Sequence, residues 1–192
     1  VTDALALWLK MRPSAFSSFQ SARASAYEPI RADGHRGYIH KVDRAHDPER
    51  ADAMEVALDA CRASAERGED LTFDRLAAWQ GIVLGKAGPA PFRSGEAWAK
   101  RGRERYGIAR DTRERFEQCL AAANDGHDLV VVRAARAYLD VCFFHPFEDG
   151  NARSARLALA HVLTRHGLGL HTAEPLFLIP RNVEDGAWQW TR

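Results

Sequence analysis

Apolar residues recur every three or four positions along most of the chain after residue 48, which is the spacing of amphipathic helices. In the first such stretch Met54, Leu58 and Cys61 share one face, and Gly68 ends the pattern. A later stretch, residues 130–144, is apolar nearly all round, as is typical of a helix buried at the centre of a domain. Altogether the spacing predicts helices over residues 49–67, 72–84, 111–123, 130–144 and 151–166.

Local signals add detail to three of these helices. Thr72 is a favourable N-cap residue for the second helix. Asp111, with Glu114 three residues later, has the spacing of a capping box at the start of the third helix. The only polar positions of the fourth helix form one stripe, made of Arg133, Arg136 and Asp140.

The segments outside these helices lack helical spacing. Residues 92–108 follow the helix breaker Pro89-Ala90-Pro91 and are predicted to form a loop or a β-hairpin. Other strand-like spacing is confined to Leu176–Ile179, so the predicted fold class is mainly α. We expect residues 1–48 to be an N-terminal extension, whose structure the pattern does not define, ahead of a domain at 49–192.

Composition narrows the environment and the partners. The 192 residues include 27 basic and 26 acidic side chains, so no whole-chain field favours binding to nucleic acid or to a membrane surface. No apolar run approaches the roughly 20 residues of a membrane-spanning helix. The first residues show no basic leader of a signal peptide, and the three separated cysteines fit a reducing compartment. We therefore expect a cytoplasmic protein.

The chemistry is concentrated between the fourth and fifth helices, in His145-Pro146-Phe147-Glu148-Asp149-Gly150-Asn151-Ala152-Arg153-Ser154-Ala155-Arg156. This string places a histidine and a carboxylate on a loop, directly before a helix N-terminus whose free N–H groups and dipole favour an anion. Arg153 and Arg156, three residues apart, share one face of that helix and suit bidentate binding of phosphate oxygens. A histidine, with an ordinary pKa near 6.5, suits proton removal from a hydroxyl at neutral pH.

The same string resembles the signature of the Fic family, His-Pro-Phe-x-(Asp/Glu)-Gly-Asn-Gly-Arg-x-x-Arg, at every position but one. The likeness extends more loosely from about Glu49 to His166. It implies a Fic-fold helical bundle with a short β-hairpin flap over the active site. It also implies a protein AMPylator, an adenylyltransferase that moves AMP from ATP to a Ser, Thr or Tyr hydroxyl of a target protein.

The resemblance assigns a role to each matching position. His145 would be the general base, Asp149 would hold Mg²⁺, and Phe147 would anchor the loop in the core. Gly150, Asn151 and Ala152 would form the anion hole, and Arg153 and Arg156 would bind the β- and γ-phosphates. Phe92 and Arg93, at the start of the irregular segment, would belong to the flap that docks the target.

Ala152 is the departure, because the family usually has glycine there. In a right-handed helical conformation alanine fits without backbone strain, and only its methyl group meets the phosphates. A lysine at this place in the related Doc-type proteins accompanies transfer of the γ-phosphate instead. The alternatives therefore include another donor, such as phosphotransfer, a different nucleotide or phosphocholine. They also include a small-molecule acceptor and an inactive Fic-fold binding module.

Regulation is the second departure. Many family members carry an inhibitory helix with Ser/Thr-x-x-x-Glu, whose glutamate pairs with the second arginine of the signature. No Ser or Thr of this chain has a Glu four residues later. The resemblance then points to a separate small inhibitor, as in a toxin held by an antitoxin protein, or to regulation that is absent or of another kind.

Overall fold

The long helices lie where the hydrophobic spacing predicts them. The computed structural model describes residues 1–17 and 32–178. The predicted helices correspond to α4 (Pro48–Glu66), α5 (Phe73–Val83), α6 (Thr112–Asn124), α7 (Val130–Phe144) and α8 (Asn151–Arg165). The described residues are mainly helical with one small sheet, which confirms the predicted class. None of the described helices has both the length and the apolar character needed to cross a membrane.

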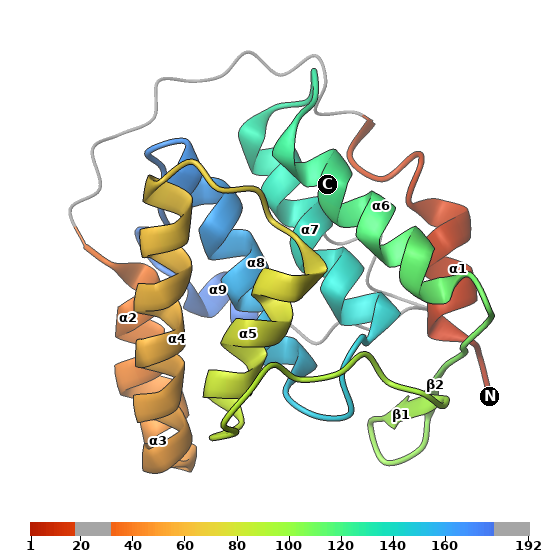
Figure 1. Cartoon of the computed structure of the whole chain (residues 1–192), viewed down its shortest axis with the longest axis horizontal. Coiled ribbons are helices and arrows are strands. Elements are labelled where there is room, and N and C mark those ends of the chain that lie inside the picture. The colour runs from red at the N-terminus through yellow and green to blue at the C-terminus, as the bar shows by residue number, and fades with distance from the viewer. Residues whose placement is uncertain (18–31, 179–192) are drawn as a thin grey trace.

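Helices α7 and α8 form the centre of the bundle. They pack closely on each other, α8 also packs on α4 and α5, and α7 also packs on α6 and α1 (Ala4–Met11). Figure 1 shows this arrangement, with α4 on one side and α6 and α1 on the other. Because α7 is enclosed on both sides, its nearly uniform apolar surface is buried, as the sequence predicts. The loop that joins α7 to α8 therefore starts and ends on the two best-supported elements.

The starts of the helices agree only in part with the sequence signals. Thr72 caps α5 as predicted, because its Oγ1 accepts the N–H of Arg75 at 3.3 Å. The capping box predicted at Asp111 is wrong, since the Asp111 side chain makes no cap hydrogen bond. The next residue, Thr112, is used instead: its Oγ1 accepts the N–H of Ala109 at 2.7 Å and fixes the turn that precedes the helix.

The predicted hairpin is present in the irregular segment. Strands β1 (Ala97–Ala99) and β2 (Glu104–Tyr106) pair antiparallel, with Trp98 opposite Arg105. The turn uses Lys100, Arg101 and Gly102, all with positive φ. The hairpin lies at the α6 and α1 end of the molecule, close to the loop after α7 (Figure 1).

The described part of residues 1–48 is helical and packs into the same core. Helix α1 is followed, after the segment outside the description, by α2 (Gly34–Tyr38), a π-helical turn (Ile39–Asp43) and α3 (Arg44–His46). Trp8 is fully buried and donates its indole N–H to Asp140 Oδ1 at 2.9 Å. Arg12 binds the same carboxylate through two N–H groups at 2.7 and 2.8 Å. Asp140 of α7 is thus neutralised from the N-terminal region, and the division at residue 48 stays a prediction.

The strand predicted at Leu176–Ile179 is wrong over its described part. The structure has a short helix there, α9 (Glu174–Phe177), and Ile179 lies outside the described residues. Pro175 occupies the first turn, where its fixed φ favours a helix and its missing N–H costs nothing. Phe177 is buried against Tyr38 and Tyr138, which explains the apolar character without a strand.

Candidate active site

The loop between α7 and α8 is held tightly by its own residues. His145 ends α7 in a left-handed conformation with φ 50° and ψ 54°, and Gly150 begins α8 with φ 77°. Between them Phe147 is only 1 % exposed and stacks on Phe73 at 5.8 Å, as the anchoring prediction requires. Asn151 closes the loop, because its amide Nδ2 donates to the Phe147 carbonyl at 2.7 Å and its Oδ1 accepts the Phe147 N–H at 2.9 Å. The Asn151 side chain is therefore used for loop geometry, and the N-cap position is taken by Gly150.

A buried glutamine of α5 supports the loop between α7 and α8. Gln80 of α5 is fully buried and donates its Nε2 to the Asp149 carbonyl at 2.5 Å. Its Oε1 accepts the hydroxyl of Ser154 on α8. A Cβ on Gly150 would lie 2.4 Å from Gln80 Nε2, so this position requires glycine for space as well as for its positive φ. The sequence pattern placed Gln80 on a helix but gave it no role.

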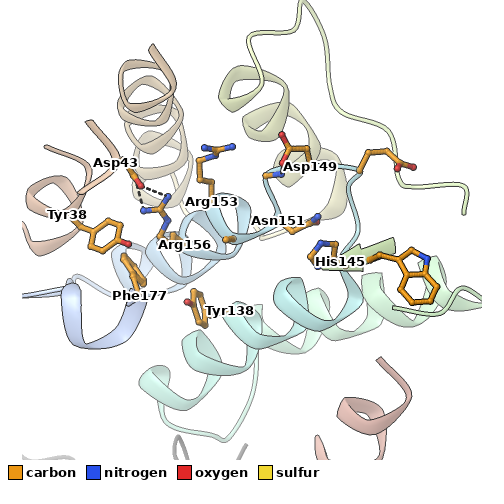
Figure 2. A pocket seen from close by; sticks show the side chains of 13 residues that line it. Tyr38, Asp43, Tyr138, His145, Asp149, Asn151, Arg153, Arg156 and Phe177 are labelled. Carbon is orange, nitrogen blue, oxygen red and sulfur yellow. Dashed lines mark hydrogen bonds and ion pairs between the residues drawn. The ribbon is translucent and has the colours of Figure 1, made fainter. Parts of the chain in front are cut away.

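The signature residues surround one cavity of about 490 Å³. This size is within the range of small-molecule sites. Figure 2 shows His145 at one end of the opening and the pair of Arg156 with Asp43 at the other, with Asp149, Asn151 and Arg153 between. The cavity is lined by His145, Gly150, Asn151, Ala152, Arg153, Arg156 and Asp149 among the predicted residues, and by Tyr38, Asp43, Trp98, Tyr138, Glu148 and Phe177 in addition.

The orientation of His145 is defined by two contacts. Its Nδ1 lies 3.2 Å from the carbonyl oxygen of Cys142, which can only accept, so this contact places the proton on Nδ1 and the basic lone pair on Nε2. Its ring stacks on Tyr106 of β2, with centroids 4.2 Å apart and planes 16° apart. A left-handed backbone costs a non-glycine residue about 1 kcal/mol or more, which is typical of residues held for function.

Arg153 and Arg156 differ in their surroundings. Arg153 makes no side-chain hydrogen bond or ion pair among those seen in residues 1–17 and 32–178. Burial lowers its pKa, and the neighbouring charge of Arg50 adds to that lowering. A bound anion would relieve this excess of positive charge, since α8 also directs its N-terminal dipole here. The geometry thus favours Arg153 as a ready phosphate ligand.

Arg156 is occupied by a carboxylate of the same chain. Its Nη1 and Nη2 donate to the two oxygens of Asp43 at 2.8 and 3.2 Å. The guanidinium is 5 % exposed and lies over the rings of Tyr38 and Phe177, at 5.0 and 5.5 Å from their centroids. A γ-phosphate at Arg156 would have to replace Asp43 or share the guanidinium with it.

Asp149 presents a carboxylate to the cavity from an exposed position. Its Oδ1 accepts the N–H of Gly150 at 2.6 Å, and its Oδ2 is 3.5 Å from Nη1 of Arg50 on α4. No cluster of three or more His, Cys, Asp or Glu side chains in the described residues forms a metal cage. A single carboxylate beside Arg153 would fit Mg²⁺ if phosphates were bound there, because Mg²⁺ binds through one or two carboxylates together with substrate phosphates.

Ala152 resolves the question of backbone strain. It is the second residue of α8, it is exposed at the cavity, and it is absent from the residues with positive φ. Alanine therefore occupies the usual glycine position without strain, and only its methyl group changes the shape of the site.

Phe92 and Arg93 lie beneath the hairpin and outside the cavity. Phe92 packs on Phe73 and Phe116 at 5.5 and 6.1 Å. Arg93 is 2 % exposed and donates to the carbonyls of Gly95, Gly107 and Phe144, which ties both ends of the hairpin to the end of α7. These positions support the flap, whereas Trp98, 52 % exposed on β1, is the hairpin side chain that lines the cavity.

The comparisons with known proteins agree with this geometry. Residues 70–163 match the model of the Fic/DOC family. A crystal structure described as a Fic domain containing signaling protein from Bacteroides thetaiotaomicron has the same fold, with a TM-score of 0.54 and 20 % sequence identity. The alignment covers 96 % of this chain and 79 % of that one. A comparison with curated proteins gave no match.

The fold and the site thus define a helical bundle of the Fic type with a short hairpin beside its signature loop. Residues 70–163 are similar to the Fic/DOC family, and the chain shares its fold with a Fic domain protein. The family generally comprises AMPylation-type and related transferases.

Proposed function

We propose that this protein transfers AMP from ATP to a hydroxyl group of a target protein. The observation that carries the proposal is the convergence of His145, Asp149, Arg153 and Arg156 on one cavity of about 490 Å³. His145 and the arginines lie at different ends of the cavity, so a bound nucleotide would have its phosphates between a base and a cationic helix terminus. This arrangement supports phosphate-group transfer more directly than it supports a binding module.

The proposed reaction uses the chain's residues in a simple order. His145 Nε2 takes the proton of the acceptor hydroxyl as the hydroxyl oxygen attacks the α-phosphorus of ATP. The bond from that phosphorus to the oxygen bridging the α- and β-phosphates breaks, and pyrophosphate leaves. Arg153, the N–H groups at the start of α8, and Arg156 once released from Asp43 would stabilise the charge on the leaving group.

Asp149 would hold Mg²⁺ beside the phosphates. The ion, when bound, supplies charge neutralisation of the α- and β-phosphates. Arg50, whose Nη1 lies 3.5 Å from Asp149 Oδ2, would have to move aside or turn to the phosphates when the ion binds.

The donor is tested by mass. The full chain is incubated with a constant amount of cell lysate, Mg²⁺ and one nucleotide at a time, and modified peptides are measured by mass spectrometry. We expect an added AMP residue with ATP, and no addition with a His145→Ala variant. An added phosphate or a different nucleotide would show another donor chemistry. No addition with any donor, from protein that binds ATP, would refute transfer to proteins.

The proposal of a separate inhibitor protein rests on the family resemblance alone. Co-purification of the tagged chain from its own cells tests it, because a toxin held by an antitoxin would copurify with one small partner in constant ratio.

A further inference from the structure

The ring of Tyr106 covers one face of His145. The two rings are nearly parallel, with centroids 4.2 Å apart and planes 16° apart, and Tyr106 is 5 % exposed. The hydrogen bond between Nδ1 and the Cys142 carbonyl holds one edge of the imidazole, and the stacked ring of Tyr106 lies against its face. The stack therefore contributes to the direction in which Nε2 points.

Tyr106 is itself held along the hairpin. Its hydroxyl donates to Glu104 Oε2 at 2.8 Å, and Glu104 Oε1 accepts from Lys100 Nζ at 2.6 Å. Its backbone pairs with Ala97 across the hairpin. A ring fixed at its hydroxyl and at its backbone is a rigid support for the imidazole.

Asp3 fixes the strand on both sides of Tyr106. Its Oδ2 accepts from Arg105 Nη2 at 3.1 Å, and its Oδ1 accepts the N–H of Gly107 at 3.3 Å. The same Oδ1 accepts the N–H of Ala6 at 3.0 Å and so caps α1. A Cβ on Gly107 would lie 2.4 Å from Asp3 Oδ2, which shows how closely the two segments meet. The N-terminal helix is thereby connected to the strand that supports His145.

We propose that Tyr106 is a positioning residue for His145, and that Asp3 keeps Tyr106 in register by binding the residues on either side of it. The proposal deepens the proposed function and rests on it for its catalytic part. The placement of the imidazole ring, however, can be measured whether or not the protein transfers AMP.

The test compares Tyr106→Leu, which removes the stack, with Tyr106→Phe, which keeps the ring and loses the bond to Glu104. Arg101→Ala, an exposed change in the hairpin turn, is the matched control. Imidazole proton shifts are measured by NMR on histidine-labelled full chain, with the His145 signals assigned from the His145→Ala spectrum. ATP affinity is measured by calorimetry. The initial rate is measured as the transfer of label from ATP labelled at the α-phosphate to a constant amount of cell lysate.

With Tyr106→Leu we expect the His145 ring protons to lose their ring-current shift and the rate to fall roughly 10- to 100-fold, as for a reacting group displaced by about 1 Å. ATP affinity should change less than about twofold, because the displaced group does not bind phosphate. Tyr106→Phe and Arg101→Ala should keep the wild-type shifts and stay within about twofold in rate, since the stacking ring remains in both. Asp3→Ala should give part of the effect of Tyr106→Leu.

The outcomes separate the two proposals. Unchanged His145 shifts in Tyr106→Leu would refute the positioning role, and so would displaced shifts with a wild-type rate. A wild-type chain that binds ATP but transfers no label refutes the proposed function, while the NMR shifts still decide whether Tyr106 holds the ring. An equal loss of ATP affinity and rate in Tyr106→Leu would show a general structural role and would overturn the assignment.

Discussion

Replacing Asp43 by asparagine tests whether this carboxylate competes with a nucleotide for Arg156. Asp43→Asn keeps the size of the side chain and one hydrogen-bond acceptor but removes the negative charge. In the structure both Asp43 oxygens accept from the Arg156 guanidinium, at 2.8 and 3.2 Å. Since the guanidinium stays over Tyr38 and Phe177 in the variant, it should remain in place and available to a phosphate.

The size of the effect follows from the ion pair. A hydrogen bond to a charged partner contributes about 1.5–3 kcal/mol, and a neutral one about 0.5–1.5 kcal/mol. Losing the charge should therefore weaken the competition by about 1–2 kcal/mol, which corresponds to roughly 5- to 30-fold tighter binding of ATP. The free protein should become less stable by a similar amount, because a guanidinium that is 5 % exposed loses its charged partner.

Calorimetry with ATP in a His145→Ala background measures this without turnover, and thermal unfolding with and without ATP gives the stability. Asp52→Asn is the matched control, because Asp52 pairs with Arg44 near the same helices but does not line the cavity. Binding that is unchanged or weaker in a folded Asp43→Asn protein would refute the competition. Asp43 would then be a support that holds Arg156 in its binding position.

Three further changes test the supports of the site and the fold. Gln80→Leu should lower the free energy of unfolding by about 2–3 kcal/mol and weaken ATP binding, because the Asp149 carbonyl loses its donor. The control Gln118→Leu, on the exposed face of α6, should leave stability and ATP binding unchanged. Urea unfolding measures the stability, and calorimetry measures ATP binding. Asp140→Ala should cost about 3–5 kcal/mol by urea unfolding, since it leaves Arg12 without its buried carboxylate, and a loss below 1 kcal/mol would contradict the contact. Burial lowers the pKa of His35 to about 3, below its unfolded value near 6.5, so the folded state disfavours protonation and stability falls as the pH drops below about 6.5. Urea unfolding at pH 7 and pH 5 should show this loss of stability in the wild type and a smaller loss in His35→Phe. Equal losses in the two proteins would exclude His35 as a source of the pH dependence.

The elements that could be predicted from the sequence are those whose causes are local. Residues 130–144 form α7 at the predicted bounds, because the apolar spacing there reflects burial on every side of one helix. The loop from His145 to Arg156 was also predictable, since a helix end, a glycine with positive φ and a new helix start follow each other within one short string. The predicted strand at Leu176–Ile179 failed because four apolar residues fit either a strand or a short helix, and Pro175 favoured the helix.

The contacts that orient the site could not be predicted, because they join distant parts of the chain. Asp43 is 113 residues from Arg156 and belongs to no motif, so no local pattern indicates an intramolecular carboxylate at the second arginine. Tyr106 and Gln80 are ordinary residues of a hairpin and a helix until packing brings them to His145 and Asp149. The signature string therefore supplies the chemical groups, and their directions are set by segments that carry no local signal.

Under the proposed function, the choice of donor would depend on the directions of these same side chains. Ala152 does not have a positive φ and is the second residue of α8, so the start of the helix keeps its usual geometry. An alanine methyl group adds neither charge nor a hydrogen bond, so it cannot by itself redirect transfer from the α- to the γ-phosphate. Arg50 and Arg156 are the positive charges nearest to Arg153, and Asp43 neutralises Arg156. If Asp43→Asn changed the mass of the transferred group, the donor position would be set by the availability of Arg156. If it changed only affinity and rate, the position of the phosphates would be set by the helix terminus and Arg153.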